Sequence, residues 1–130
     1  MSPPLILLAD DEPHITHIIS LKLTRAGFEV IVVEDGELAL KAAIERRPDA
    51  IVTDLQMPYL SGIELAQQLS TNEHCRDIPI ILLTARGYAV EEELKNLPSI
   101  KKMLSKPFSA KDLLKDINAL LSNDGEERAA

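Results

Sequence analysis

Five short apolar runs, regularly spaced along the chain, limit its possible folds more than any other feature. Their first residues lie 21 to 28 positions apart, which is too long for hairpins but fits strand–helix–strand units. The runs are rich in Ile, Val and Leu with little alternation, as is typical of parallel strands buried on both faces. We therefore predict parallel strands at Leu5–Ala9, Glu29–Val33, Ala50–Asp54, Ile78–Leu83 and Ile100–Ser105.

The segments between these runs carry apolar residues at helical spacing. Pro13 suits a first helical turn and Gly27 a helix end, so they delimit the first predicted helix. Ser109 and Asp112 predict a capped start for the last helix, which extends through Leu121. The other helices are predicted at 36–46, 63–70 and 91–96. This alternation of strands and helices predicts a doubly wound α/β sheet.

The length and charge of the chain restrict its organisation and its partners. A chain of 130 residues is one domain, so we predict a domain over residues 1–123 and a flexible polar tail over 124–130. The net charge of −7 argues against direct binding of nucleic acid or of an anionic membrane surface. No apolar run approaches the roughly 20 residues of a membrane span. Cys75 is the lone cysteine, which favours a reducing cytoplasm.

Polar residues follow four of the predicted strands. In open α/β sheets, sites form beyond the carboxyl ends of the strands, so these residues are expected to converge. Three converging carboxylates require a cation, most simply Mg²⁺, and a nearby Lys and Thr suit phosphoryl chemistry with a carboxylate as nucleophile. The candidates are Asp10, Asp11 and Glu12 after the first strand, Asp54 at the third, Thr84 at the fourth and Lys106 at the fifth.

The ordered set of motifs resembles the receiver domain of bacterial two-component response regulators over about residues 4–122. The motifs are Asp10-Asp11-Glu12, Asp35-Gly36, Pro48-Asp49, Asp54-Leu55-Gln56-Met57-Pro58 with Gly62, Thr84-Ala85 and Lys106-Pro107-Phe108. The resemblance implies a three-layer flavodoxin-like (βα)5 fold with a five-stranded parallel sheet in the order 2-1-3-4-5.

The same resemblance implies roles for individual residues. Asp54 would accept a phosphoryl group from a phosphohistidine, and Thr84 and Lys106 would bind phosphoryl oxygens. Mg²⁺ would be held by Asp10, Asp11, Asp54 and the backbone carbonyl of Gln56. The Lys106–Pro107 peptide would be cis. Such a domain is a signalling module rather than an enzyme, although it assists its own phosphorylation and autodephosphorylation.

The resemblance also implies partners. A sensor histidine kinase or a phosphotransfer protein would supply the phosphoryl group in the cytoplasm. Phosphorylation would switch contacts with an effector protein or output domain through the face formed by the fourth helix, fifth strand and fifth helix. A phosphorylation-dependent homodimer is a further expectation. Because 130 residues hold the receiver alone, we expect a free-standing receiver or a piece of a longer regulator.

The chain departs from the family pattern at several positions. Met103 stands where the family usually carries Tyr or Phe, so a switch that buries an aromatic ring is not expected to work in the usual way. Tyr88 is a weak candidate to replace it. Gln56 and Arg86 lie where the family tunes the lifetime of the aspartyl phosphate, and they predict a longer-lived phosphoryl state than small residues would give.

Other interpretations of these residues remain open from the sequence. Asp10 and Asp11 alone are typical of a helix N-terminus. A haloacid-dehalogenase-like phosphatase also uses Asp, Mg²⁺, Thr and Lys, but its second Asp lies two residues after the first, where this chain has Glu12. A flavin-binding fold is disfavoured because the loops lack aromatic residues. A receiver that binds without being phosphorylated is the last alternative. His14 and His17 lack a third ligand for zinc.

Overall fold

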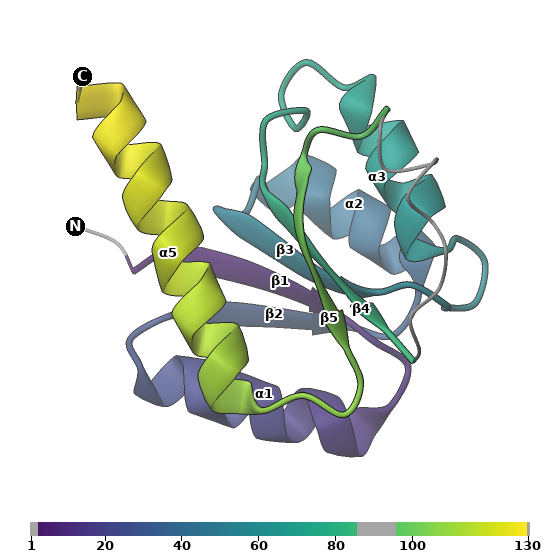
Figure 1. The fold of residues 1–130 in the computed structure, drawn as a ribbon. Helices are drawn as coiled ribbons and strands as arrows, with labels where there is room; N and C mark the ends of the chain where they lie inside the picture. Colours follow the sequence, from purple (N-terminus) through teal and green to yellow (C-terminus); the bar gives the residue numbers. More distant parts are fainter. Residues whose placement is uncertain (1–2, 86–95, 130) are drawn as a thin grey trace.

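The five strands form one parallel sheet in the order β2-β1-β3-β4-β5 (Figure 1). The computed structural model describes residues 3–85 and 96–129, with side chains up to Ser122. The strands are β1 (Leu5–Ala9), β2 (Glu29–Val33), β3 (Ala50–Asp54), β4 (Ile80–Thr84) and β5 (Ile100–Ser105). Four of them have the predicted bounds. The fourth begins two residues later than predicted because Pro79 has no N–H for the sheet, and Ile78 N–H donates to Cys75 O instead.

The described helices are α1 (Pro13–Arg25), α2 (Gly36–Arg46), α3 (Gly62–Ser70) and α5 (Ala110–Ala129). In Figure 1, α1 and α5 cover one face of the sheet, and α2 and α3 cover the other. This three-layer arrangement and the strand order confirm the predicted flavodoxin-like fold. Most of the fourth predicted helix, residues 91–95, lies outside the described residues. The helix α5 includes most of the segment 124–130, whose flexibility stays a prediction.

Alternate residues of the strands fill two separate cores. Leu7 and Ile51 point to the layer of α2 and α3, whereas Ile6 and Val52 point to the layer of α1 and α5. Both sets are fully buried. The outermost strand β5 exposes its lysines, as predicted for an edge strand. No described helix combines the length and apolar character that crossing a membrane would require.

Side-chain caps fix the starts of α2, α3 and α5. Asp35 Oδ1 accepts a hydrogen bond from Leu38 N–H at 2.8 Å at the start of α2. Ser61 and Glu64 form a reciprocal capping box at the start of α3. At the start of α5, Ser109 Oγ accepts from the N–H of Asp112 at 2.9 Å, as the sequence predicted.

The strand register brings the carboxyl ends of the central strands to one edge. Ala9 pairs with Thr53, the residue before Asp54, and Thr84 pairs with Ser105, the residue before Lys106. The chain therefore leaves the sheet at this edge at the ends of β1, β3, β4 and β5, and each of these exits carries at least one of the candidate side chains.

Candidate functional site

One lysine ammonium contacts three carboxylates at the carboxyl edge of the sheet. Lys106 Nζ lies 2.9 Å from Glu12 Oε1, 3.2 Å from Asp10 Oδ2 and 3.4 Å from Asp54 Oδ2. The three partners come from the ends of β1 and β3, while the lysine follows β5. The structure thus brings together Asp10, Glu12, Asp54 and Lys106, as their positions at the strand ends predicted.

Asp10 is held rigidly at the end of β1. Its side chain is buried, its N–H donates to Val33 O, and its Oδ1 accepts from the N–H of Glu12 at 3.0 Å. The next residue, Asp11, is exposed. The two neighbouring acids therefore differ in kind, because Asp10 is a fixed buried charge and Asp11 faces the solvent.

Asp54 ends β3 at a tight backbone turn. Leu55 N–H donates to Leu83 O at 2.7 Å, and Leu55 O accepts from Gly62 N–H at 2.8 Å. A Cβ at Gly62 would lie 2.5 Å from Asp54 O and 2.7 Å from Leu82 Cδ1. Only glycine fits there, so the start of α3 can pack directly on the backbone of the candidate acceptor.

Lys106 is anchored by its backbone and by its charge. Its N–H donates to Thr84 O at 2.7 Å, and the Lys106–Pro107 peptide is cis, which confirms that prediction. Burial alone lowers the pKa of Lys106, but the hydrogen bond with Glu12 and the charges of Asp10 and Asp54 outweigh it and raise the pKa. The ammonium is therefore always charged at neutral pH.

The surroundings shift the pKa values of Asp54 and Glu12 in opposite directions. Burial, followed by the charge of Asp10, raises the pKa of Asp54 to about 6, against the lowering effect of Lys106. The hydrogen bond with Lys106 instead lowers the pKa of Glu12. Asp54 is thus the carboxylate whose charge is least well compensated in the absence of a further cation.

The acidic residues fit a hard divalent cation. One oxygen from each of Asp10, Asp11, Glu12 and Asp54 lies within 4.8 Å of the others, and this is the one such group among the described residues. Carboxylate oxygens at that spacing are the ligands that Mg²⁺ prefers. Glu12 was predicted to lie at this edge with the acidic pair, but it was not among the predicted metal ligands and had no predicted role.

The remaining predicted residues line a cavity beside Asp54. Its volume is about 370 Å³, and Thr84 and Gln56 both contribute to its wall. Thr84 is fully buried at the end of β4. The full lining is Asp11, Glu12, Asp54, Leu55, Gln56, Thr84, Ala85 and Lys106. The cavity offers carboxylates, a hydroxyl residue and an ammonium in its wall.

The residues at which the sequence departs from the pattern are only partly described. Met103 is partly buried and packs on the core shared with α2 and α3, where an unbranched thioether fills space without a polar group. Arg86 and Tyr88 lie outside the described residues. His14 is exposed, with Nε2 3.9 Å from Glu12 Oε2.

Comparison with protein families gives one match over most of the chain. Residues 6–118 match the model of the response regulator receiver domain. The chain is 37% identical over 124 residues to the phosphate regulon transcriptional regulatory protein PhoB of Pseudomonas aeruginosa, covering 92% of this chain and 52% of the relative. It is also 34% identical to the DNA-binding dual master transcriptional regulator RpaA of Synechocystis, covering 91% and 49%. The chain thus spans about half the length of these relatives.

Solved structures show the same architecture. The chemotaxis response regulator CheY4 of Vibrio cholerae superposes with a TM-score of 0.84 at 30% identity, covering 92% of this chain and all of that one. The receiver domain of the sensor histidine kinase PA1611 of Pseudomonas aeruginosa, with a magnesium ion coordinated in its active site cleft, has a TM-score of 0.83 at 30% identity. That comparison covers 93% of this chain and 99% of the other.

Proposed function

The chain belongs to the response regulator receiver domain family, and from this premise we propose that it is a phosphoryl-accepting switch with Asp54 as the acceptor. The observation that carries the proposal is the position of Asp54. Its carboxylate borders the cavity, 3.4 Å from the ammonium of Lys106 and within 4.8 Å of three further carboxylates. A nucleophile, a fixed positive charge and an oxygen cluster for a cation are what phosphoryl transfer to a carboxylate requires.

The transfer uses Asp54 as a nucleophile. An Oδ of ionised Asp54 attacks the phosphorus of a phosphohistidine, the P–O bond forms as the P–N bond breaks, and the imidazole leaves with a proton from water. The pKa of Asp54, about 6, lies below neutral pH, so the carboxylate form predominates at pH 7. Lys106 supplies a permanent positive charge for the phosphoryl oxygens, and Thr84 supplies a hydroxyl donor from the same cavity wall.

Asp10, Asp11, Asp54 and the backbone carbonyl of Gln56 would hold Mg²⁺ in this site. When bound, the ion supplies positive charge that offsets the negative charge of the phosphoryl oxygens. The support for this assignment is the spacing of the carboxylates and the position of Gln56 in the cavity wall. The same cavity admits water to the phosphorylated residue, which supports slow autodephosphorylation.

The partners follow from the family. A sensor histidine kinase or a phosphotransfer protein in the cytoplasm supplies the phosphoryl group, and an output domain or separate effector reads the state of Asp54. The full-length relatives are transcriptional regulators about twice as long as the matched region, which supports an attached or separate output function. The domain itself binds neither nucleic acid nor membrane, in keeping with its net charge of −7.

We assign the output to the face that includes β5 and α5, together with the segment between β4 and β5, and we assign any phosphorylation-dependent homodimer to the same face. We assign residues 1–123 to the receiver and 124–130 to a segment after it, most of which continues α5. The exposed lysines of β5 give this face a charge that differs from the acidic edge.

The test is phosphorylation by a small donor. The wild type is incubated with phosphoramidate and Mg²⁺ and followed by intact mass, beside Asp54→Asn and the matched control Asp77→Asn, which neutralises an exposed carboxylate outside the cavity lining. We expect one phosphoryl group on the wild type and on Asp77→Asn, and none on Asp54→Asn. Equal phosphorylation of all three, or of none, contradicts the assignment.

A further inference from the structure

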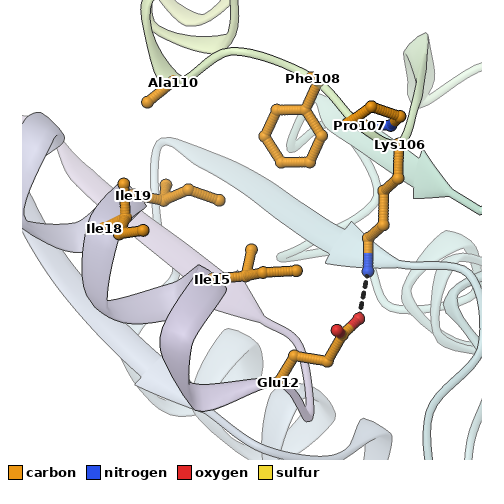
Figure 2. Close-up of a pocket in the computed structure, with 8 residues that line it drawn as sticks. All are labelled: Glu12, Ile15, Ile18, Ile19, Lys106, Pro107, Phe108 and Ala110. Carbon is orange, nitrogen blue, oxygen red and sulfur yellow. Dashed lines mark hydrogen bonds and ion pairs between the residues drawn. The ribbon is translucent and has the colours of Figure 1, made fainter.

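Glu12 lies at the boundary between two cavities. It lines the cavity beside Asp54 and also a more apolar groove of about 420 Å³ between α1 and the start of α5. Among the described residues, Lys106 is the only other one that borders both. Figure 2 shows the Glu12 side chain extending from the start of α1 to meet the ammonium, with Ile15 and Phe108 on the groove side. The Glu12–Lys106 pair is therefore the shared wall of the two spaces.

The backbone of Glu12 is fixed at the start of α1, and its side chain is directed to Lys106. Glu12 is the N-cap residue of α1, its N–H donates to Asp10 Oδ1, and its carbonyl accepts from Thr16 N–H at 3.1 Å. Its carboxylate makes no capping bond to its own helix. An acidic side chain at a helix start ordinarily turns back to the free N–H groups, whereas this one reaches a lysine 94 residues away.

Glu12 and Asp54 compete for the same ammonium. Lys106 Nζ lies 0.5 Å nearer to Glu12 than to Asp54, at 2.9 Å against 3.4 Å. The Glu12 side chain is 43% exposed, while the Asp54 side chain is 10% exposed. Glu12 can therefore exchange the lysine for water at little cost, whereas Asp54 cannot.

We propose that Glu12 is a positioning residue that shares Lys106 with Asp54 in the unphosphorylated state, draws the ammonium toward itself, and releases it to the phosphoryl group. The inference rests on the proposed function, because it concerns the lysine of that site. The negative charge of Glu12 then opposes the approach of Lys106 to the phosphoryl oxygens. Removing that charge from Glu12 accelerates phosphorylation of Asp54.

The kinetic test compares Glu12→Gln with wild type, using Glu29→Gln as the matched control. Glu29 is paired with Arg46 at 3.4 Å at the start of β2 and lies outside both cavity linings. With phosphoramidate and Mg²⁺, the P–N bond of the donor breaks as the P–O bond forms on Asp54 and ammonia leaves. We expect Glu12→Gln to be phosphorylated about two- to fivefold faster, the scale of a partly exposed ion pair, and Glu29→Gln to match wild type.

A second pair of variants separates an effect through Lys106 from a general loss of repulsion toward the anionic donor. In a Lys106→Ala background, followed over hours, Glu12→Gln is expected to leave the phosphorylation rate unchanged. An equal acceleration with and without Lys106, no acceleration, or a slower reaction of Glu12→Gln overturns the proposal. The slower reaction would instead indicate that Glu12 is a metal ligand.

A structural readout decides the inference independently of the chemistry. Metal-free crystal structures of wild type and Glu12→Gln are compared at the same pH. We expect Lys106 Nζ to lie closer to Asp54 Oδ2 in the variant, and an unchanged distance overturns the proposal. If Asp54→Asn shows that the chain is not phosphorylated at Asp54, the proposed function fails while this comparison still reports on the Glu12–Lys106 pair.

Discussion

Replacing Asp54 by Asn is expected to stabilise the metal-free protein at neutral pH. The folded protein raises the pKa of Asp54 from 3.8 to about 6, chiefly by burial and next by the charge of Asp10. A raised carboxyl pKa means that ionised Asp54 costs folding free energy: the cost is absent below pH 3.8, grows between pH 3.8 and 6, and is complete above pH 6. The shift of about 2.2 units corresponds to about 3 kcal/mol as an upper limit.

Because Asn is nearly isosteric and uncharged, the variant should recover most of that free energy. We expect Asp54→Asn to be about 1–3 kcal/mol more stable than wild type at pH 7.5 in EDTA, with the difference disappearing by about pH 4. Urea unfolding followed by far-ultraviolet circular dichroism measures this, since the chain has no Trp. Asp77→Asn, at an exposed position, serves as the control with no expected change.

Two results would refute this reasoning. If Asp54→Asn is no more stable than wild type at pH 7.5, the carboxylate is not strained by its surroundings. If the gain is the same at pH 4 as at pH 7.5, the gain comes from packing rather than from charge. Addition of Mg²⁺ should shrink the difference, because a ligand that binds only the folded wild-type site stabilises it by mass action.

Two further predictions concern the backbone and the metal. Gly62→Ala places a Cβ 2.5 Å from Asp54 O and is expected to lower the free energy of unfolding by about 1–3 kcal/mol, measured by urea unfolding; an unchanged midpoint would mean that α3 shifts freely. Asp11→Asn removes an exposed oxygen ligand and is expected to weaken Mg²⁺ binding at least about tenfold in isothermal titration calorimetry, while unfolding in EDTA stays unchanged; equal Mg²⁺ affinity would exclude Asp11 as a ligand.

The sheet was predictable because its determinants are local. Each buried run, such as Leu5–Ala9 or Ala50–Asp54, is short, apolar and bounded by polar residues, so its bounds can be read from the chain. The start of β4 could not be predicted in this way. The apolar run begins at Ile78, but Pro79 has no N–H to donate to the sheet, and the strand begins at Ile80. The strand order came from the family resemblance, since neither spacing nor apolar pattern specifies which strands are neighbours.

The residues of the candidate site could be predicted from the sequence, but the carboxylate that pairs most closely with Lys106 could not. Asp10, Asp54 and Lys106 each follow a strand, and parallel strands bring their carboxyl ends together. The choice of Glu12 as the nearest partner of Lys106 depends on a side-chain direction at the start of α1, which no local pattern encodes. The capping box of Ser61 and Glu64, by contrast, had a visible signal in their three-residue spacing.

The charges at the carboxyl edge explain why Lys106 needs more than one partner. Four carboxylates and one ammonium lie together among the described residues, which leaves a formal charge of −3 when all are ionised. A divalent cation brings the total to −1, and an incoming phosphoryl group restores negative charge at Asp54. Lys106 can turn to the phosphoryl oxygens at the lowest cost when the carboxylate that it leaves is exposed and can be solvated by water. Glu12 meets that condition, because Asp10 and Asp54 are both buried. Glu12 therefore retards the approach of Lys106 to the phosphoryl oxygens, and it gives up the ammonium to them as their charge grows.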